Sequence, residues 1–269
     1  MPDGLRRIAA LLEYDGSGFA GWQSQAHAAS VQDSVEAALG FVAGARVSAT
    51  CAGRTDAGVH ALGQVVHFDT RALRTPRAWV LGANTRLPAT IALKWAAEVS
   101  LEFHARHTAV RRTYRYAILN SSARSALDHL RCAWMPQPLD AGAMHAAAQA
   151  LVGEHDFSAF RSVECQSKTP VRRIERIAVR RTGEWIGLEV AANAFLHHMV
   201  RNIVGTLLDA QLESDPVAAV RRVLSSRDRR LAGATAPAAG LYLWRVEYPA
   251  GHEIPAPSER LSAPAGLFC

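Results

Sequence analysis

Apolar and polar residues follow two periods along this chain, and the two periods predict an alternation of strands and helices. The apolar run at residues 5–13 predicts a buried strand that ends at a turn, Tyr14-Asp15-Gly16-Ser17. Ser30-Val31-Gln32-Asp33 has the capping-box pattern, and apolar residues at helical spacing follow it as far as Gly44. The other elements expected in this half are strands at 46–52, 64–70 and 91–97 and a helix at 76–84.

The second half repeats this order of elements without repeating its sequence. Period-two alternation and helical spacing predict strands at 113–119, 174–180, 185–191 and 241–248, with helices at 140–152, 196–212 and 216–225. We therefore expect an α+β protein with two ferredoxin-like α/β halves, each with an antiparallel sheet. The predicted domains are residues 1–105 and 106–248, followed by a proline-containing tail, 249–269, extended over the surface.

Composition indicates a folded, basic protein with an anionic partner. The chain has 269 residues, 49% of them hydrophobic, a formal charge of +6 and a pI near 9.5. Nucleic acid is the leading candidate for the partner. Of the 30 lysines and arginines only Lys94 and Lys168 are lysine, which fits either codon usage or selection for the bidentate grip of arginine on phosphate.

The cysteines and the hydropathy pattern favour a reducing compartment. Cys51, Cys132, Cys165 and Cys269 are far apart and form no Cys-x-x-Cys pair, so neither a disulfide framework nor a zinc knuckle is indicated. No apolar run is long enough to span a membrane, and the N-terminus lacks the pattern of a signal peptide. A cytoplasmic protein that does not bind membranes is expected.

One carboxylate, Asp56, lies in the glycine-containing segment GRTDAGVHALGQVVHFDT at residues 53–70. Gly53 and Gly58 allow unusual backbone conformations and close approach of a ligand. Arg54 would favour the ionised carboxylate, which suits a nucleophile or an electrostatic stabiliser. The alternative is an ordinary Asp-Ala-Gly turn with a surface ion pair.

Arg201 lies among apolar residues in FLHHMVRNIVG, residues 195–205, on a predicted helix. It could pair with Asp56 or hold a phosphate, or it could point to solvent. In the same segment, His197 and His198 are adjacent and would point in different directions on a helix. His60 and His67, like His104 and His107, lack a completing set of cysteines or carboxylates at ligand spacing. No metal site is expected.

The run RRTYRY, residues 111–116, alternates basic and aromatic residues on a predicted strand, which places Tyr114 and Tyr116 on one face and Arg115 on the other. Aromatic rings that stack on bases, beside arginines that hold phosphates, are typical of single-strand or flipped-base recognition. A tyrosine pair in a core face would give the same pattern. No phosphate loop or dinucleotide fingerprint is present, so no nucleotide cofactor is implied.

Five blocks, in this order, give the chain its resemblance to a known family. They are YDGSGFAGWQSQ (14–25), GRTDAGVHALGQVVHF (53–68), FHAR with RRTYRY (103–116), KTPVRRI (168–174) and FLHHMVRNIVG (195–205). Taken together, these blocks resemble the bacterial tRNA pseudouridine synthase A family. The resemblance spans nearly the whole chain, and the block around Asp56 is its most specific part.

The resemblance implies an enzyme that converts uridine to pseudouridine at positions 38, 39 and 40 of the tRNA anticodon stem-loop, without cofactor or metal. It implies the pseudouridine synthase fold, with the two halves joined around a central RNA-binding cleft, and a homodimer that contacts the tRNA with both subunits. Carried over by block, Asp56 is the expected catalytic aspartate, with Arg54 and Arg201 as basic neighbours. The residues expected to bind substrate are Tyr114, Arg115, His60 and Gln64.

Two other classes of function stay open on the residues alone. A non-catalytic RNA-binding or chaperone protein would use the same basic and aromatic surface. A metal-dependent hydrolase could be built on Asp56 and His60. Loss of turnover with retained RNA binding in Asp56→Asn would exclude the first, and activity in the presence of a chelator would exclude the second.

Overall fold

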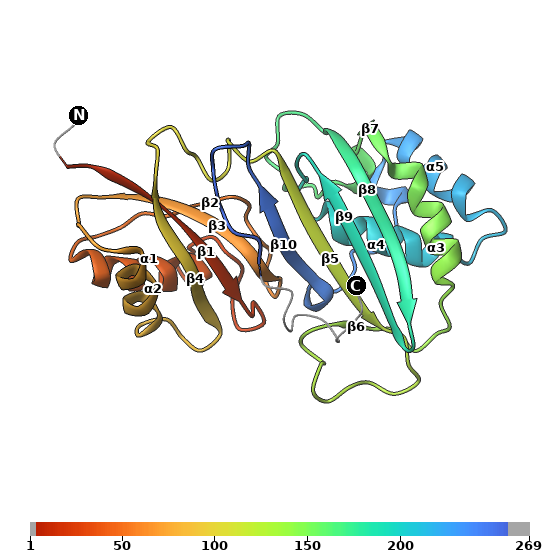
Figure 1. Ribbon diagram of the computed structural model, residues 1–269. Helices are drawn as coiled ribbons and strands as arrows, with labels where there is room; N and C mark the ends of the chain where they lie inside the picture. The colour runs from red at the N-terminus through yellow and green to blue at the C-terminus, as the bar shows by residue number, and fades with distance from the viewer. Residues whose placement is uncertain (1–3, 258–269) are drawn as a thin grey trace. The chain divides into compact units, whose positions relative to one another are not determined.

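The computed structural model describes residues 4–257, which divide into two compact units (Figure 1). Residues 4–110 and 242–257 form the N-terminal unit, and residues 111–241 form the C-terminal unit. The sequence analysis places the strand at 241–248 in the C-terminal half, whereas from Tyr242 onward this strand belongs to the N-terminal unit. Its placement depends on pairing with a strand more than 150 residues earlier, which no local pattern reports.

The N-terminal unit has a sheet in the order β4-β1-β3-β10. β1 pairs antiparallel with β3 and β4, whereas β10 pairs in parallel with the first residues of β3. β2 pairs with β3 near its other end, where Cys51 lies opposite Val66. The elements are β1 (Arg6–Tyr14), α1 (Val31–Ala43), β2 (Thr50–Cys51), β3 (His60–Thr70), α2 (Pro76–Asn84), β4 (Ile91–Val99) and β10 (Leu241–Glu247).

Helices α1 and α2 lie side by side on one face of this sheet (Figure 1). The Ser30 hydroxyl accepts a hydrogen bond from Asp33 N at 3.1 Å, and Gly44 ends α1 in the left-handed region with a φ of 69°, as the capping pattern predicts. Trp79 of α2 packs against Phe68 of β3 with ring centroids 5.1 Å apart, and both side chains are almost fully buried. The core therefore lies between the helices and the sheet.

The C-terminal unit has a sheet in the order β5-β9-β8-β7, with antiparallel pairs throughout and a short parallel pair between β6 and β5. Helices α3, α4 and α5 pack together, and α3 lies on β8. The elements are β5 (Arg111–Leu119), β6 (Ala133–Trp134), α3 (Ala141–Ala148), β7 (Gly153–Asp156), β8 (Val171–Thr182), β9 (Trp185–Ala192), α4 (Met199–Ala210) and α5 (Pro216–Ser226), with 3-10 turns at Gln149–Leu151, Ser158–Phe160, Arg229–Leu231 and Ala238–Gly240. The predicted α+β class is confirmed.

Three predicted elements are clearly shorter than the sequence pattern indicates. The helix expected at 140–152 is one of them, because α3 ends at Ala148 and a 3-10 turn follows it. The strand expected at 46–52 is reduced to Thr50–Cys51, because Ala49 N donates to the Glu36 carboxylate at 2.8 Å instead of to a neighbouring strand. The helix expected from residue 196 begins at Met199, because His198 has a φ of 62° and cannot continue a helix. In the tail, residues 252–257 contain no helix or strand, and residues 258–269 lie outside the described part.

Three of the four cysteines lie within the described residues. Cys51, Cys132 and Cys165 are buried and unpaired, and Cys269 lies outside the described residues. Across residues 4–257, none of the helices combines the length and the apolar character that a membrane crossing needs.

Gly205 should be essential to the packing of the C-terminal unit. A Cβ at this position of α4 would lie 1.8 Å from Ala234 O, so Gly205→Ala forces the helix and the 232–236 segment apart. We expect a loss of about 3 kcal/mol in the free energy of unfolding, although alanine favours an isolated helix by about 1 kcal/mol. Urea denaturation checks this, with Gly18→Ala as the control, because no atom lies within 4 Å of a Cβ at Gly18. Equal stability of the two variants would contradict the packing argument.

Candidate active site

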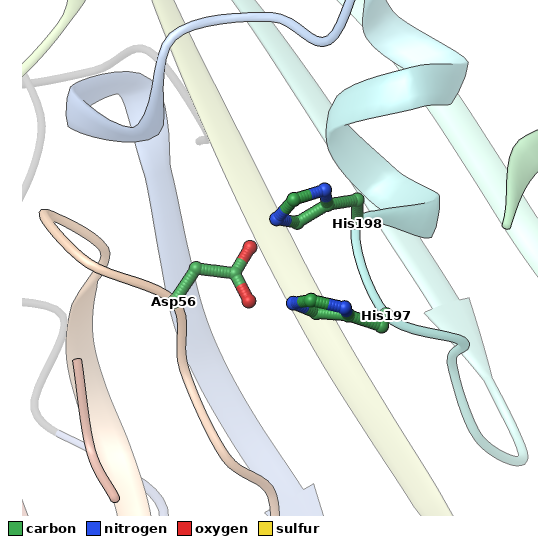
Figure 2. Close-up of side chains that lie close together, drawn as sticks. All are labelled: Asp56, His197 and His198. Carbon is green, nitrogen blue, oxygen red and sulfur yellow. The ribbon is translucent and has the colours of Figure 1, made fainter. Parts of the chain in front are cut away.

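Asp56 lies on the loop between β2 and β3, on a turn that the chain closes with its own backbone. Val59 N donates to Asp56 O at 3.1 Å, and Gly58 takes a φ of 76° in the third position of the turn. That position of a type II turn needs a positive φ, which glycine adopts without strain. The Asp56 side chain is half-buried, whereas Arg54 is exposed (Figure 2 shows Asp56 on this loop).

The segment that follows β1 supports this loop from the other side. Trp22 N donates to Thr55 O at 3.0 Å, and Gly58 N donates to Phe19 O at 3.3 Å. Gly21 has a φ of 102°, and a Cβ there would lie 2.7 Å from Thr55 O. The backbone of the YDGSGFAGW segment therefore packs directly on the backbone of the GRTDAGVH segment, and Gly21 allows the close approach.

His60 is the first residue of β3 and is 2% exposed. Its Nδ1 accepts a hydrogen bond from Gly16 N at 3.1 Å, and its ring stacks on Tyr242 with centroids 4.7 Å apart. Asp15 Oδ1 lies 3.2 Å from the same nitrogen. While Nδ1 accepts from Gly16 N–H it carries a lone pair and the ring is neutral. The approach of Asp15 is an ion pair only if the ring is protonated, and Nδ1 would then no longer accept from Gly16 N. His60 thus joins β3 to the 15–16 turn.

Gln64 is four residues further along β3 and is fully buried. Its Nε2 donates to Gly53 O at 2.7 Å, at the beginning of the Asp56 loop. The structure therefore gathers the four predicted residues of this unit on one loop and the strand that follows it. On the strand, His60 and Gln64 are buried. On the loop, Asp56 is half-buried and Arg54 is exposed.

Arg106 is a basic residue near this loop that the sequence analysis quotes only as part of FHAR. Burial raises the pKa of the Cys51 thiol to about 12, and the charges of Arg54 and Arg106 both oppose this rise. Both guanidinium groups therefore act on the same thiol at the base of the loop. A pair of arginines 52 positions apart could not be recognised from spacing alone.

The position of Arg106 is fixed through Ala105. His67 Nδ1 accepts from Ala105 N at 3.1 Å, and the Tyr248 hydroxyl donates to Ala105 O at 2.8 Å. Burial, followed by the charge of Arg7, lowers the pKa of His67 to about 4, so its ring is neutral at neutral pH and able to accept. This contact connects the FHAR block to β3.

In the C-terminal unit, Tyr114 and Tyr116 share one face of β5 and Arg115 occupies the other, as the alternation predicts. Tyr114 is 9% exposed and packs edge-to-face on Phe195, with centroids 5.0 Å apart and an interplanar angle of 81°. The Tyr116 hydroxyl donates to Pro237 O at 2.7 Å. Arg115 Nε donates to the Glu189 carboxylate at 2.7 Å on the neighbouring strand. Arg115 therefore has an acidic partner that the sequence pattern did not indicate.

Arg201 lies in the first turn of α4 and is half-buried. Its Nε donates to Ala236 O at 2.8 Å, and Ala236 N donates to Arg201 O at 3.2 Å. The 232–236 segment thus holds both the backbone and the side chain of this residue.

The two histidines before α4 do not lie as the sequence analysis expects. The helical pattern predicts that the side chains of His197 and His198 point apart, but both residues precede the helix, His198 has a left-handed backbone, and the ring centroids lie 4.0 Å apart (Figure 2). The reason given for excluding them as neighbouring ligands is therefore wrong.

Comparison with known proteins identifies the family. The family model described as tRNA pseudouridine synthase matches residues 10–108 and 147–249. These segments include Arg54, Asp56 and Arg201, whereas Tyr114 and Arg115 lie between them.

Relatives with closely similar sequences carry the same description. The chain is 51% identical to a tRNA pseudouridine synthase A of Cronobacter sakazakii over 251 residues, which is 93% of both chains. It is 52% identical to one of Idiomarina loihiensis and 51% identical to one of a Shewanella species, in each case over 93% of this chain and 95% of the relative. The chain belongs to the tRNA pseudouridine synthase family, whose members are isomerases.

Proposed function

We propose that this protein isomerises uridine to pseudouridine at positions 38, 39 and 40 of the tRNA anticodon stem-loop, with Asp56 as the catalytic aspartate and with no cofactor or metal. The single observation that carries the proposal is the position of Asp56. Within a chain of this family, a half-buried carboxylate lies on a glycine-closed turn that a second segment supports through Thr55 O.

The reaction requires a group of this kind. Pseudouridine formation breaks the N1–C1′ bond of uridine, turns the uracil and joins C5 to C1′; the proton on C5 is lost to solvent and N1 takes up a proton, so the composition is unchanged. A carboxylate can attack covalently, stabilise positive charge at C1′, or remove a proton in a glycal route. Each of these steps needs the carboxylate ionised and held in a fixed place, and the turn at Asp56 provides the second of these conditions.

We propose that Arg54 and Arg201 are the basic residues of the reaction. Arg54 is exposed and two positions from Asp56, which suits contact with a phosphate or with the carboxylate itself. Arg201 has its Nε bonded to Ala236 O, which fixes the plane of the guanidinium and orients its two terminal nitrogens.

We propose that Tyr114 stacks on the target base and that Arg115, His60 and Gln64 serve substrate binding. The target uridine must leave the base stack, at a cost of a few kcal/mol that stacking on an aromatic ring offsets. The edge-to-face contact with Phe195 supports this role, because it holds the Tyr114 ring in one orientation before the base arrives. His60 and Gln64 are buried, so their part is indirect: they would hold the backbone of the Asp56 loop against which the bound uridine reacts, without contact to the substrate.

The main test is release of tritium from tRNA labelled at uridine C5, with a chelator present. Three substrates would each carry uridine at only one of positions 38, 39 and 40. We expect release from all three by the wild type, and a loss of at least about 10³-fold in Asp56→Asn, as for other electrostatic groups that act on the transition state.

Binding and folding controls make this test specific. Asp56→Asn should bind tRNA in a filter assay as the wild type does, because asparagine keeps the size of the side chain, and its melting temperature should be unchanged. Full activity in Asp56→Asn would overturn the catalytic role. Release from a uridine outside the anticodon arm, with none from these three positions, would overturn the site assignment.

The stacking role of Tyr114 predicts different results for two variants. Tyr114→Phe should keep tRNA affinity, because the ring is retained, whereas Tyr114→Ala should lose roughly 10- to 100-fold, as stacking contributes about 1–3 kcal/mol per base. Tyr116→Phe, which removes a buried hydroxyl on the same face of β5, is the control and should leave affinity unchanged. A full loss of affinity in Tyr114→Phe would show that stacking is not its function.

The family resemblance also leads us to propose that the protein is a homodimer that binds one tRNA anticodon arm with both subunits. Sedimentation equilibrium should then give twice the chain mass of 29.1 kDa. A monomer at micromolar concentration, with full activity, would contradict this assembly.

A further inference from the structure

A buried chain of hydrogen bonds connects the end of β1, the middle of β3 and the Asp56 loop. The hydroxyls of Tyr14 and Thr55 lie 2.8 Å apart. Gln64 Nε2 lies 3.3 Å from the Tyr14 hydroxyl and 2.7 Å from Gly53 O. The exposed fractions of Tyr14, Thr55 and Gln64 are 3%, 6% and 0%. The residues on both sides of Arg54, Gly53 and Thr55, are thus each bonded to a buried side chain.

The amide of Gln64 can satisfy these contacts in only one orientation. A carbonyl oxygen such as Gly53 O accepts hydrogen bonds, so the group 2.7 Å from it must be the NH₂. The other end, Gln64 Oε1, is then left buried and without a partner among residues 4–257. Such an acceptor lowers the stability of the folded state, but an apolar side chain of the same size would remove it only by leaving Gly53 O without its donor. The glutamine therefore leaves one of its own atoms without a hydrogen bond while its other end holds Gly53 O.

The stretch from Gly53 to Thr55, which precedes the turn at Asp56, depends on contacts from other segments. Gly53 restricts its backbone less than any other residue would, and Arg54 is exposed. This stretch is held by Gln64 at Gly53 O, by Tyr14 at the Thr55 hydroxyl, and by Trp22 at Thr55 O. Two of these three contacts belong to the buried chain of hydrogen bonds.

We propose that Gln64 and Tyr14 are positioning residues for catalysis: they fix the backbone from Gly53 to Thr55 and so the point from which the Asp56 side chain begins. This inference rests on the proposed catalytic role of Asp56. Neither residue needs to touch the substrate. A displacement of about 1 Å of a catalytic group is enough to reduce turnover about 100-fold, so the loss of one contact has a measurable effect.

The test compares Gln64→Leu and Tyr14→Phe with the wild type by kcat, KM for tRNA and melting temperature. Gln64→Leu should lower kcat about 10- to 100-fold and leave KM within about twofold. It should lower the melting temperature no more than the control variant Asn84→Leu does, because both variants remove an amide that bonds to backbone, and Gln64→Leu also removes the unpartnered Oε1. Tyr14→Phe should show a smaller loss of kcat with the same KM. The double variant should be no slower than Gln64→Leu, because both changes act through the same loop.

Asn84→Leu is the matched control. The Asn84 side chain also bonds to backbone, with Nδ2 2.9 Å from Leu93 O and Oδ1 2.8 Å from Leu93 N, but it joins α2 to β4 away from the Asp56 loop. This variant should lower the melting temperature and leave kcat unchanged. A role of Gln64 that is merely structural would give the same pattern in Gln64→Leu.

The other outcomes separate this inference from the proposed function. Inactive Asp56→Asn with fully active Gln64→Leu and Tyr14→Phe would overturn the positioning roles alone. A rise in KM without a change in kcat would assign Gln64 to direct substrate contact and would also overturn them. If Gln64→Leu fails to fold, Tyr14→Phe decides, because it keeps the bond from Gln64 to Gly53 O. An active Asp56→Asn would remove the basis of both proposals.

Discussion

The hydrogen bond from Trp22 N to Thr55 O is the contact on which the architecture of the candidate site depends. It requires two backbones to approach each other, and Gly21 allows this because it has no Cβ and takes a φ of 102°. Once the contact forms, Thr55 is fixed through its carbonyl, and the turn that begins at Asp56 has a rigid base. Tyr14, Gly16 and Phe19 contribute further bonds from the same segment. A 12-residue block after β1 therefore serves mainly to hold a loop about 35 residues later in the chain.

The sheet of the N-terminal unit provides the frame for this arrangement. β3 is paired along one edge with β1, while its other edge pairs with β2 near one end and with β10 near the other. The chain leaves β2 at Cys51 and enters β3 at His60, so the Asp56 loop bridges two points that are both fixed by pairing. Gly63, in the strand itself, must be glycine, since a Cβ there would lie 2.2 Å from Trp244 O of β10.

The parts of the fold that sequence predicts well are those whose causes are local. The cap at Ser30 and the glycine that ends α1 each act within a few residues, and the structure has them where the sequence places them. The errors have distant causes. Residues 46–49 alternate like a strand, but Ala49 N donates to the Glu36 carboxylate of α1 instead of to a neighbouring strand. The histidines at 197 and 198 follow an apolar helical pattern, yet a left-handed residue delays the helix. From Tyr242 onward β10 belongs to the N-terminal unit, although more than 100 residues separate it from the rest of that unit in the sequence.

The candidate site divides in the same way. The local sequence alone indicates Asp56, because six consecutive residues, 53–58, contain an acidic residue between two glycines with an arginine two positions before it. Spacing gave no sign that Glu189 pairs with Arg115, that Arg106 shares a neighbour with Arg54, or that Tyr14 and Thr55 meet across 41 residues. Gln64 shows why such features matter. Its amide leaves one buried acceptor without a partner among residues 4–257, while its other end bonds to Gly53 O. This departure from full hydrogen bonding lies where the backbone of the Asp56 loop is held in place, which is where a functional site is expected to depart from the most stable arrangement.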